Sequence, residues 1–297
     1  MPKNDFQPGS SSLEDFFKFI NARHDIWVRR FVLEEPKPWT EEPIFLDYKF
    51  TNVFRQLDTG TIALRRLLAL QSWDYHPNWN VEEKRQNDQQ LIWTLCWYRL
   101  FNLDIHAYHW IDKKRIPSLR DLLSYVQQRD NDGLKVFTSA HLTTSELARD
   151  KIDTYSDAVE SAWNYRSEVL DAARTWNTLE SVFEPLKKIK CVGPFVAYEI
   201  ICDLRFTKIL NNAADINSWA NVGPGAKRGL ERLGMTPVVS SMIALWGLRQ
   251  DRCSSNVLNA PVPFELREIE HSLCEFDKYE RVRTGVGRPR QRYKGRA

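Results

Sequence analysis

The feature that most limits the fold of this chain is a pair of apolar helical segments joined by a glycine turn. Residues 186–229 read LKKIKCVGPFVAYEIICDLRFTKILNNAADINSWANVGPGAKRG. The turn separates a short helix, predicted over 178–190, from a second helix over 194–206. Such a turn exposes backbone N–H groups and a helix N-terminus, which together suit a phosphate group. We therefore predict a helical hairpin that binds a nucleic-acid phosphate through Val192 and Gly193.

Helical periodicity dominates the rest of the chain, and no segment alternates apolar and polar residues as a strand does. We predict an all-α fold, with Ser12 as the N-cap of the first helix. The domain over residues 1–280 is expected to be helical throughout, as one body or as two lobes. Its other predicted helices cover residues 12–33, 50–71 with an interruption near Gly60, 81–102, 118–129, 143–175 as one or two pieces, 225–233, 237–249 and 262–282.

Composition limits the class of protein. The chain has 297 residues, of which 42% are hydrophobic, so it can bury a sizeable core. No apolar run reaches the roughly 18 residues that a membrane span needs, and the N-terminus lacks the order of a signal peptide. Five scattered cysteines without a CxxC pair argue against a zinc or iron–sulfur site. We expect a cytoplasmic protein without a metal or another cofactor.

Basic residues are concentrated at the C-terminus. The chain carries a net charge of +3, but residues 281–297 alone hold six arginines and one lysine without any acid. The remainder is therefore acidic, at 3 − 7 = −4. Such an arm can follow phosphates along a nucleic acid, and we predict contacts through Arg288, Arg290 and Arg292. The alternative is a solubilising tail.

One aspartate, Asp215, follows the predicted hairpin in the sequence. Asp215 lies 22 residues after Gly193. The segment resembles the helix-hairpin-helix of base-excision DNA glycosylases, in which an essential aspartate follows a Leu-Pro-Gly-Val-Gly turn at about this distance. Cys191 departs from that pattern because glycine is usual there. Phe195 replaces the lysine of lyase-type glycosylases, which excludes a Schiff base at that position. The alternative is an ordinary helical turn, with Asp215 as an N-cap.

A second glycine-rich segment, GPGAKRG over residues 223–229, precedes a predicted helix. Exposed N–H groups and two cations in the first turn would bind a phosphate or pyrophosphate. We name Gly223, Gly225, Lys227 and Arg228 as candidates for this role. The alternative is a plain loop with solvated charges.

Two further segments combine polar groups on helical spacing. In FTNVFRQLDTGT (50–61), Asn52, Arg55 and Asp58 would share one helix face and serve a polar ligand, or Arg55 and Asp58 would form an ion pair. In REIEHSLCEFDKYERVR (267–283), the candidate acid–base, nucleophilic and ligand-binding groups fall within two turns. They are His271, Cys274, Asp277 and Lys278. Structural roles are the alternative for these four residues.

Together these segments resemble one family, the alpha-glutamyl/putrescinyl thymine pyrophosphorylases. These bacteriophage enzymes are amino acid:DNA transferases of thymine hypermodification. Their helical fold is related to the helix-hairpin-helix glycosylases, and the helical domain of 5-hydroxymethyluracil DNA kinases belongs to the same group. The resemblance covers roughly residues 12–290. It is carried by FTNVFRQLDTGT, CWYRLFN, KCVGPFVAYEIICDL, NVGPGAKRGL and EHSLCEFDKYERVRTGVGRPR.

The resemblance implies a reaction on DNA in an infected bacterial cell. A separate kinase would first prepare pyrophosphorylated hydroxymethyluracil. This chain would then displace pyrophosphate from the base with an amino acid or a polyamine such as putrescine. Asp215 and His271 would act as bases toward the amine, and cations including Arg55 would hold the pyrophosphate. A monofunctional glycosylase and a non-catalytic DNA-binding module are the alternatives. No GxxxxGK[ST] motif occurs in the sequence, which argues against a Walker-type kinase.

Overall fold

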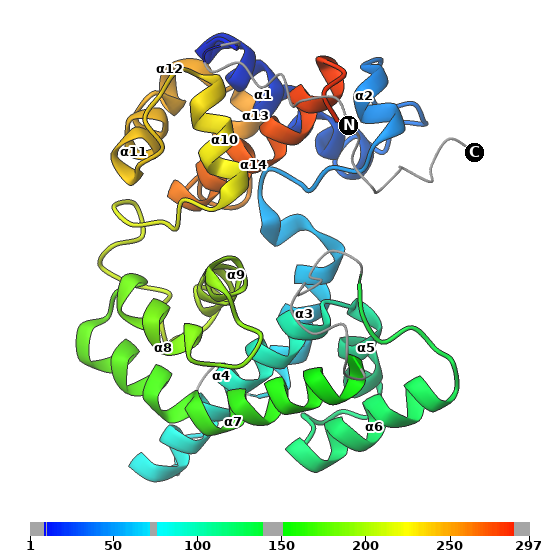
Figure 1. Cartoon of the computed structure of the whole chain (residues 1–297), viewed down its shortest axis with the longest axis vertical. Coiled ribbons are helices and arrows are strands. Elements are labelled where there is room, and N and C mark those ends of the chain that lie inside the picture. Colours follow the sequence, from blue (N-terminus) through cyan, green and yellow to red (C-terminus); the bar gives the residue numbers. More distant parts are fainter. Residues whose placement is uncertain (1–8, 10, 72–75, 139–150, 288–297) are drawn as a thin grey trace. The chain divides into compact units, whose positions relative to one another are not determined.

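The computed structural model describes residues 9, 11–71, 76–138 and 151–287. Every regular element in these residues is a helix, which confirms the prediction of an all-α fold (Figure 1). The chain divides into two compact units. One joins Met1–Asp58 to Asn217–Ala297, and the other is Thr59–Ile216. Within the described residues, no helix is both long enough and apolar enough to cross a membrane.

The unit built from the two ends of the chain, unit 1, contains seven α-helices and one short 3-10 helix within its described residues. They are α1 (Leu13–Phe31), α2 (Pro43–Asp47), η1 (Arg55–Leu57), α10 (Pro224–Arg232), α11 (Val239–Gly247), α12 (Arg249–Arg252), α13 (Ser255–Leu258) and α14 (Leu266–Arg283).

Aromatic side chains hold the N-terminal helix of unit 1 in place. Ser12 caps α1 as predicted, because its hydroxyl accepts the Asp15 N–H at 3.1 Å. The helix buries a run of aromatic and apolar side chains on one face. Phe16 packs edge-on against Phe276 of α14, with ring centroids 5.4 Å apart. The core of unit 1 therefore joins segments from opposite ends of the sequence.

Two glycines let α10 lie against α14 at close range. A side-chain carbon built on Gly225 would come 2.3 Å from Cys274 Sγ, and one on Gly229 would come 2.5 Å from the Leu273 carbonyl oxygen. Only a residue without Cβ fits at either position. Two of the glycines in the sequence motif GPGAKRG, Gly225 and Gly229, therefore serve the packing of α10 against α14.

The central segment, unit 2, contains the remaining helices. They are α3 (Thr59–Ala69), α4 (Val81–Phe101), α5 (Asp104–Asp112), α6 (Leu119–Asn131), α7 (Lys151–Trp176), η2 (Glu180–Val182), α8 (Phe183–Lys187) and α9 (Pro194–Leu204).

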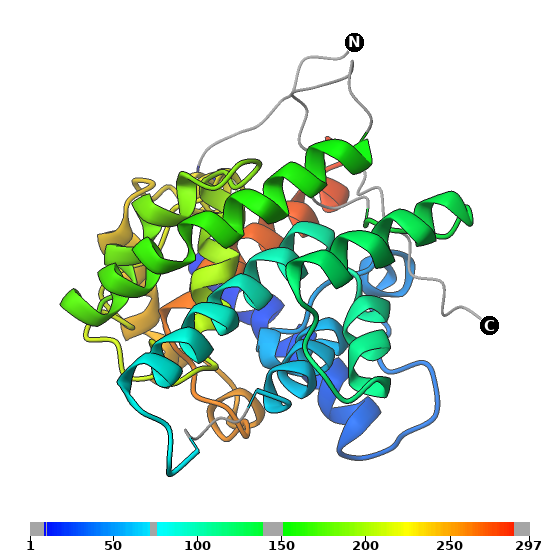
Figure 2. The same cartoon turned by 90° about the horizontal axis from the view of Figure 1, so that it is seen from below.

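Helix α4 runs from the surface into the core of unit 2, as its sequence predicts. Its first turns are largely exposed, and every residue from Leu91 to Phe101 is buried. It lies along α7 in both views (Figures 1 and 2). The Trp93 indole N–H donates to the Val159 carbonyl of α7 at 3.2 Å, so even this buried polar group is satisfied.

The predicted helices differ from the structure in two ways. The segment predicted as one helix over 50–71 is an extended loop, a 3-10 turn and then α3, and the helix contains Gly60 instead of breaking near it. Helices α2, α5, α12 and α13 were not predicted. The other predicted helices are present with shifted ends, and residues 143–150 of the one predicted over 143–175 lie outside the described residues.

Candidate functional site

The predicted hairpin is present in unit 2. It consists of α8, a turn over 188–193 and α9. Cys191 has a φ of 62°, the left-handed conformation that glycine adopts most easily, so the position departs from the glycosylase pattern in residue type but keeps its backbone shape. Val192 is buried, whereas Gly193 is exposed with open space around its Cα. Both residues lie in the turn as predicted, and their contact with a phosphate stays a prediction.

Asp215 holds the start of η2, which leads directly into α8 of the hairpin. Its two carboxylate oxygens accept the backbone N–H groups of Leu179 and Glu180 at 2.6 and 3.0 Å. These donors would otherwise be unsatisfied at the beginning of η2. The neighbouring Ala214 N–H donates to the Asn177 carbonyl at 2.9 Å, which ties the same loop to the end of α7. Asp215 therefore acts as a capping group, and it caps the preceding helices instead of the next one.

Unit 2 also contains a buried ion cluster that was not predicted. The Arg99 guanidinium of α4 makes a two-bond ion pair with Asp203 of α9, and its Nη1 lies 3.3 Å from Glu199 Oε2. Burial alone would lower the pKa of Arg99, but the two carboxylates raise it well above its usual value. The sequence signal was two acids spaced four apart in the otherwise apolar EIICD segment, which places both on one helix face.

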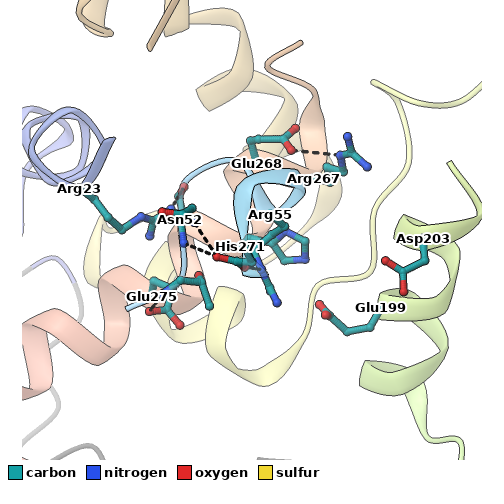
Figure 3. A network of polar contacts seen from close by, with 12 residues as sticks. Arg23, Asn52, Arg55, Glu199, Asp203, Arg267, Glu268, His271 and Glu275 are labelled. Atoms are coloured by element: carbon teal, nitrogen blue, oxygen red, sulfur yellow. Dashed lines mark hydrogen bonds and ion pairs between the residues drawn. The ribbon is translucent and has the colours of Figure 1, made fainter. Parts of the chain in front are cut away.

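The polar residues at 52–58 form a loop in unit 1, so the prediction that they share a helix face is wrong. Asp58 Oδ1 accepts both the backbone and the side-chain N–H of Asn52 at 2.9 Å, and Asp58 Oδ2 pairs with Arg55 Nε at 2.5 Å. A single carboxylate thus organises the loop, which carries Asn52 and Arg55 (Figure 3). The ion pair between Arg55 and Asp58, which was the alternative at this segment, is present.

A buried arginine lies next to this loop. Arg23 of α1 is 3% exposed, and its side chain is directed at the segment that carries Asn52 (Figure 3). Its Nη2 donates to the Ser272 hydroxyl at 2.9 Å, while Nε and Nη1 have no hydrogen-bond partner among the described residues. Burial lowers the pKa of Arg23 to about 10, and the nearby carboxylates of Glu275 and Asp58 oppose that shift.

The candidate residues predicted on helix α14 make separate contacts and do not form one site. His271 is buried, with Nε2 3.7 Å from Glu270 Oε2. Lys278 pairs with Glu275 at 2.6 Å and donates to the Lys49 carbonyl at 2.9 Å. Burial raises the pKa of Cys274 to about 12, which disfavours the thiolate that a nucleophile requires.

Glu268, at the start of α14, is a buried carboxyl that was not predicted. It accepts the backbone N–H of Glu265 at 2.9 Å and the Arg267 Nε–H at 3.0 Å. Burial raises its pKa to about 7, although Arg267 acts in the opposite direction.

Asp277 contacts three arginines in unit 1. It is fully buried on α14. Its Oδ2 accepts Arg228 Nε at 2.8 Å and lies 3.3 Å from Arg281 Nε, while Oδ1 accepts Arg232 Nε at 2.9 Å. The structure thus joins Arg228 and Asp277, which the sequence had placed in two separate candidate sites. We call Arg228, Arg232, Asp277 and Arg281 the arginine cluster.

The remaining predicted residues are placed as follows. Gly223 is the N-cap of α10, and no side chain caps that helix. Lys227 is exposed in its first turn. Their binding of a phosphate or pyrophosphate stays a prediction. Arg288, Arg290 and Arg292 lie outside the described residues. No group of three potential metal ligands occurs among the residues that the structure describes.

Comparison with known proteins decides the family. The family model described as "5-hmdU DNA kinase, helical domain" matches residues 10–286. The chain belongs to this family. A relative named 5-hmdU DNA kinase, from Bacillus phage SP10, is 28% identical over 313 residues, which cover 93% of this chain and 46% of the relative. The chain thus spans about half the length of that relative. No solved structure matches.

These findings correct the sequence-based function. The resemblance had favoured the pyrophosphorylase that acts after the kinase, whereas the match is to the kinase family of the same group. The predicted amine transfer is therefore wrong, and so are the use of an amino acid or polyamine and the position after the kinase. The glycosylase and accessory-module alternatives are not supported either. Asp215 and His271 were predicted to act as bases toward the amine, and this role falls together with the amine transfer.

Proposed function

We propose that this chain acts in the phosphorylation of 5-hydroxymethyluracil in DNA and that its helical domain binds the DNA substrate. The observation that carries the proposal is the family match, which extends over almost the whole chain. The name of the SP10 relative states the same activity. The helical fold, with arginine-rich helices in unit 1, is compatible with binding a polyanion.

The reaction itself needs positioning more than covalent chemistry. The oxygen of the 5-hydroxymethyl group attacks the terminal phosphorus of a nucleoside triphosphate. A new O–P bond forms, the bond to the bridging oxygen breaks, and the hydroxyl proton leaves. The products are a phosphate monoester on the base and a nucleoside diphosphate. The sequence has no Walker-type phosphate loop, so the triphosphate would have to be bound by groups of another kind.

A competition experiment tests the substrate. Fluorescently labelled DNA containing hydroxymethyluracil is bound to the chain and displaced with unlabelled DNA of the same sequence, containing either hydroxymethyluracil or thymine. The two competitors differ only in one hydroxyl per modified base. A site that hydrogen-bonds this hydroxyl should favour the modified DNA by about ten-fold. Equal displacement by both competitors would contradict the proposed substrate.

The reaction can be followed with triphosphate labelled at its terminal phosphate. In mixtures that contain this chain, magnesium and the modified DNA, label should appear on the hydroxymethyluracil nucleotide after digestion. DNA with thymine is the control. Equal label on both DNAs would contradict the assignment of the hydroxymethyl group as acceptor.

A further inference from the structure

The arginine cluster has more positive charge than its own carboxylates neutralise. Arg228, Arg232 and Arg281 share the single carboxylate of Asp277. The neighbouring Arg283 makes two bonds to the buried Glu280, at 2.7 and 2.6 Å. Glu280 also accepts the Ser11 hydroxyl at 2.7 Å. Asp15 also interacts electrostatically with Arg283, so among the described residues four arginines face three carboxylates and a net charge of +1 remains at this end of α10 and α14.

Two of the cluster arginines have exposed N–H donors that Asp277 does not use. The side chains of Arg228 and Arg281 are 43% and 35% exposed, whereas that of Asp277 is fully buried. Arg228 donates a hydrogen bond to Asp277 through Nε, whereas Arg281 Nε lies 3.3 Å from the same carboxylate as an ion pair without a hydrogen bond. A guanidinium has five N–H donors, so four remain on each. Within the described part of the chain, the terminal amino groups of these two residues have no partner.

The shared carboxylate also fixes how far apart the two guanidiniums can be. Arg228 Nε and Arg281 Nε lie 2.8 and 3.3 Å from the same Asp277 oxygen, so the two nitrogens are at most about 6.1 Å apart. One tetrahedral oxyanion can accept hydrogen bonds from two guanidiniums at such a separation. The carboxylate is buried and both arginines reach the surface, so an anion can approach them from the solvent side.

The packing of α10 makes this arrangement rigid. Gly225 and Gly229 bring α10 into close contact with α14, which carries Asp277 and Arg281. Arg228 and Arg232 are one helical turn apart on α10, and Asp277 and Arg281 are one turn apart on α14. The helices fix the backbone of both arginines, and Asp277 holds their Nε atoms, so binding an anion requires less ordering than two unpaired arginines would need.

We propose that Arg228 and Arg281 bind one phosphate group of the DNA backbone, with Asp277 as the residue that positions them. The geometry specifies a phosphate oxyanion, and the identification of that phosphate as part of DNA rests on the proposed function. A free phosphate would use the same chemistry, so the experiment must separate the two sources.

The test compares a double variant, Arg228→Gln with Arg281→Gln, against Arg115→Gln. Arg115 is also exposed and paired with one aspartate, Asp121, so the control removes a similar ion-paired arginine from unit 2. Affinity for thymine DNA and for hydroxymethyluracil DNA is measured at several salt concentrations. We expect the double variant to bind both DNAs about ten-fold more weakly or worse. The slope of log affinity against log salt should also fall by about 1 relative to the control.

Three controls keep the outcomes apart. Melting curves show whether the variant folds, and the charge-keeping pair Arg228→Lys with Arg281→Lys should retain most of the salt slope. Binding and slope equal to those of Arg115→Gln would overturn the site. A second result would also overturn the proposal: inorganic phosphate stabilises the chain only when both arginines are present, but DNA binding does not depend on them. The site would then bind free phosphate and not DNA. If hydroxymethyluracil and thymine DNA bind equally but both depend on the arginines, the phosphate site stands and the proposed substrate fails.

Discussion

At the scale of single residues, Asp215 shows how two backbone N–H groups can define the role of a carboxylate. Both of its oxygens are occupied by the N–H groups of Leu179 and Glu180. We expect Asp215→Ala to lower the free energy of unfolding by about 1 kcal/mol, because the cap is lost. Asp215→Asn should cost less, since an amide oxygen still accepts one of these bonds. Urea denaturation measures both, and equal losses in the two variants would contradict the capping role.

Glu268 makes stability depend on pH. Burial raises its pKa to about 7 from 4.5, so the folded chain keeps a proton that the unfolded chain has lost. Unfolding between these values releases that proton, and raising the pH therefore destabilises the fold. The loss is complete above pH 7 and is on the order of 3 kcal/mol.

The matching measurement is denaturation of wild type, Glu268→Gln and Glu184→Gln from pH 5 to pH 8. Glutamine cannot ionise but can still accept the Glu265 N–H, so Glu268→Gln should flatten the profile. Glu184 is exposed, and its variant should follow the wild type. An unchanged slope in Glu268→Gln would rule out this carboxyl as the source.

Spacing along the sequence could predict some of these residues but not their partners. Cys191 was recognised as a departure from the first glycine of the turn pattern, and its left-handed backbone explains why glycine is usual there. The pairing of Arg99 with Asp203 could not be predicted, because it joins residues 104 positions apart on two helices. Such contacts depend on tertiary packing, which periodicity does not contain.

At the scale of elements, apolar periodicity located most of the helices. It failed over residues 50–58, where the spacing of Asn52, Arg55 and Asp58 imitates a helix face. The carboxylate of Asp58 instead accepts a backbone N–H six residues earlier and closes a loop. Helix α5 was missed because it is short and mixes aromatic with polar residues. Apolar periodicity therefore does not predict loops that are closed by local hydrogen bonds, and it does not predict short helices.

The contact between α10 and α14 gives a prediction about glycine. Gly229→Ala would bring a Cβ to 2.5 Å from the Leu273 carbonyl oxygen, and a backbone atom cannot easily move away. We expect a loss of about 1–3 kcal/mol in the free energy of unfolding. Gly247→Ala, in the same unit, has nothing within 4 Å of its Cβ and should be neutral or slightly stabilising. Similar melting temperatures for the two variants would contradict the close packing.

At the scale of the whole molecule, the sequence segments identified the right group of proteins but the wrong member. The helical segments and turns that carried the resemblance describe a scaffold that the group shares. The reaction depends on a few groups at the substrate, and neither spacing nor composition distinguishes a kinase from the enzyme that follows it. The family match over residues 10–286 supplies this distinction.

Hydrogen–deuterium exchange of the chain, measured alone and with DNA, shows whether DNA binds and which helices it contacts. We expect DNA containing hydroxymethyluracil to slow exchange in α10 and α14, which carry Arg228 and Arg281, and thymine DNA at the same concentration to protect them less. Exchange in both helices that is unaffected by either DNA would contradict the phosphate site. Equal protection by the two DNAs, at concentrations below saturation, would contradict hydroxymethyluracil as the substrate.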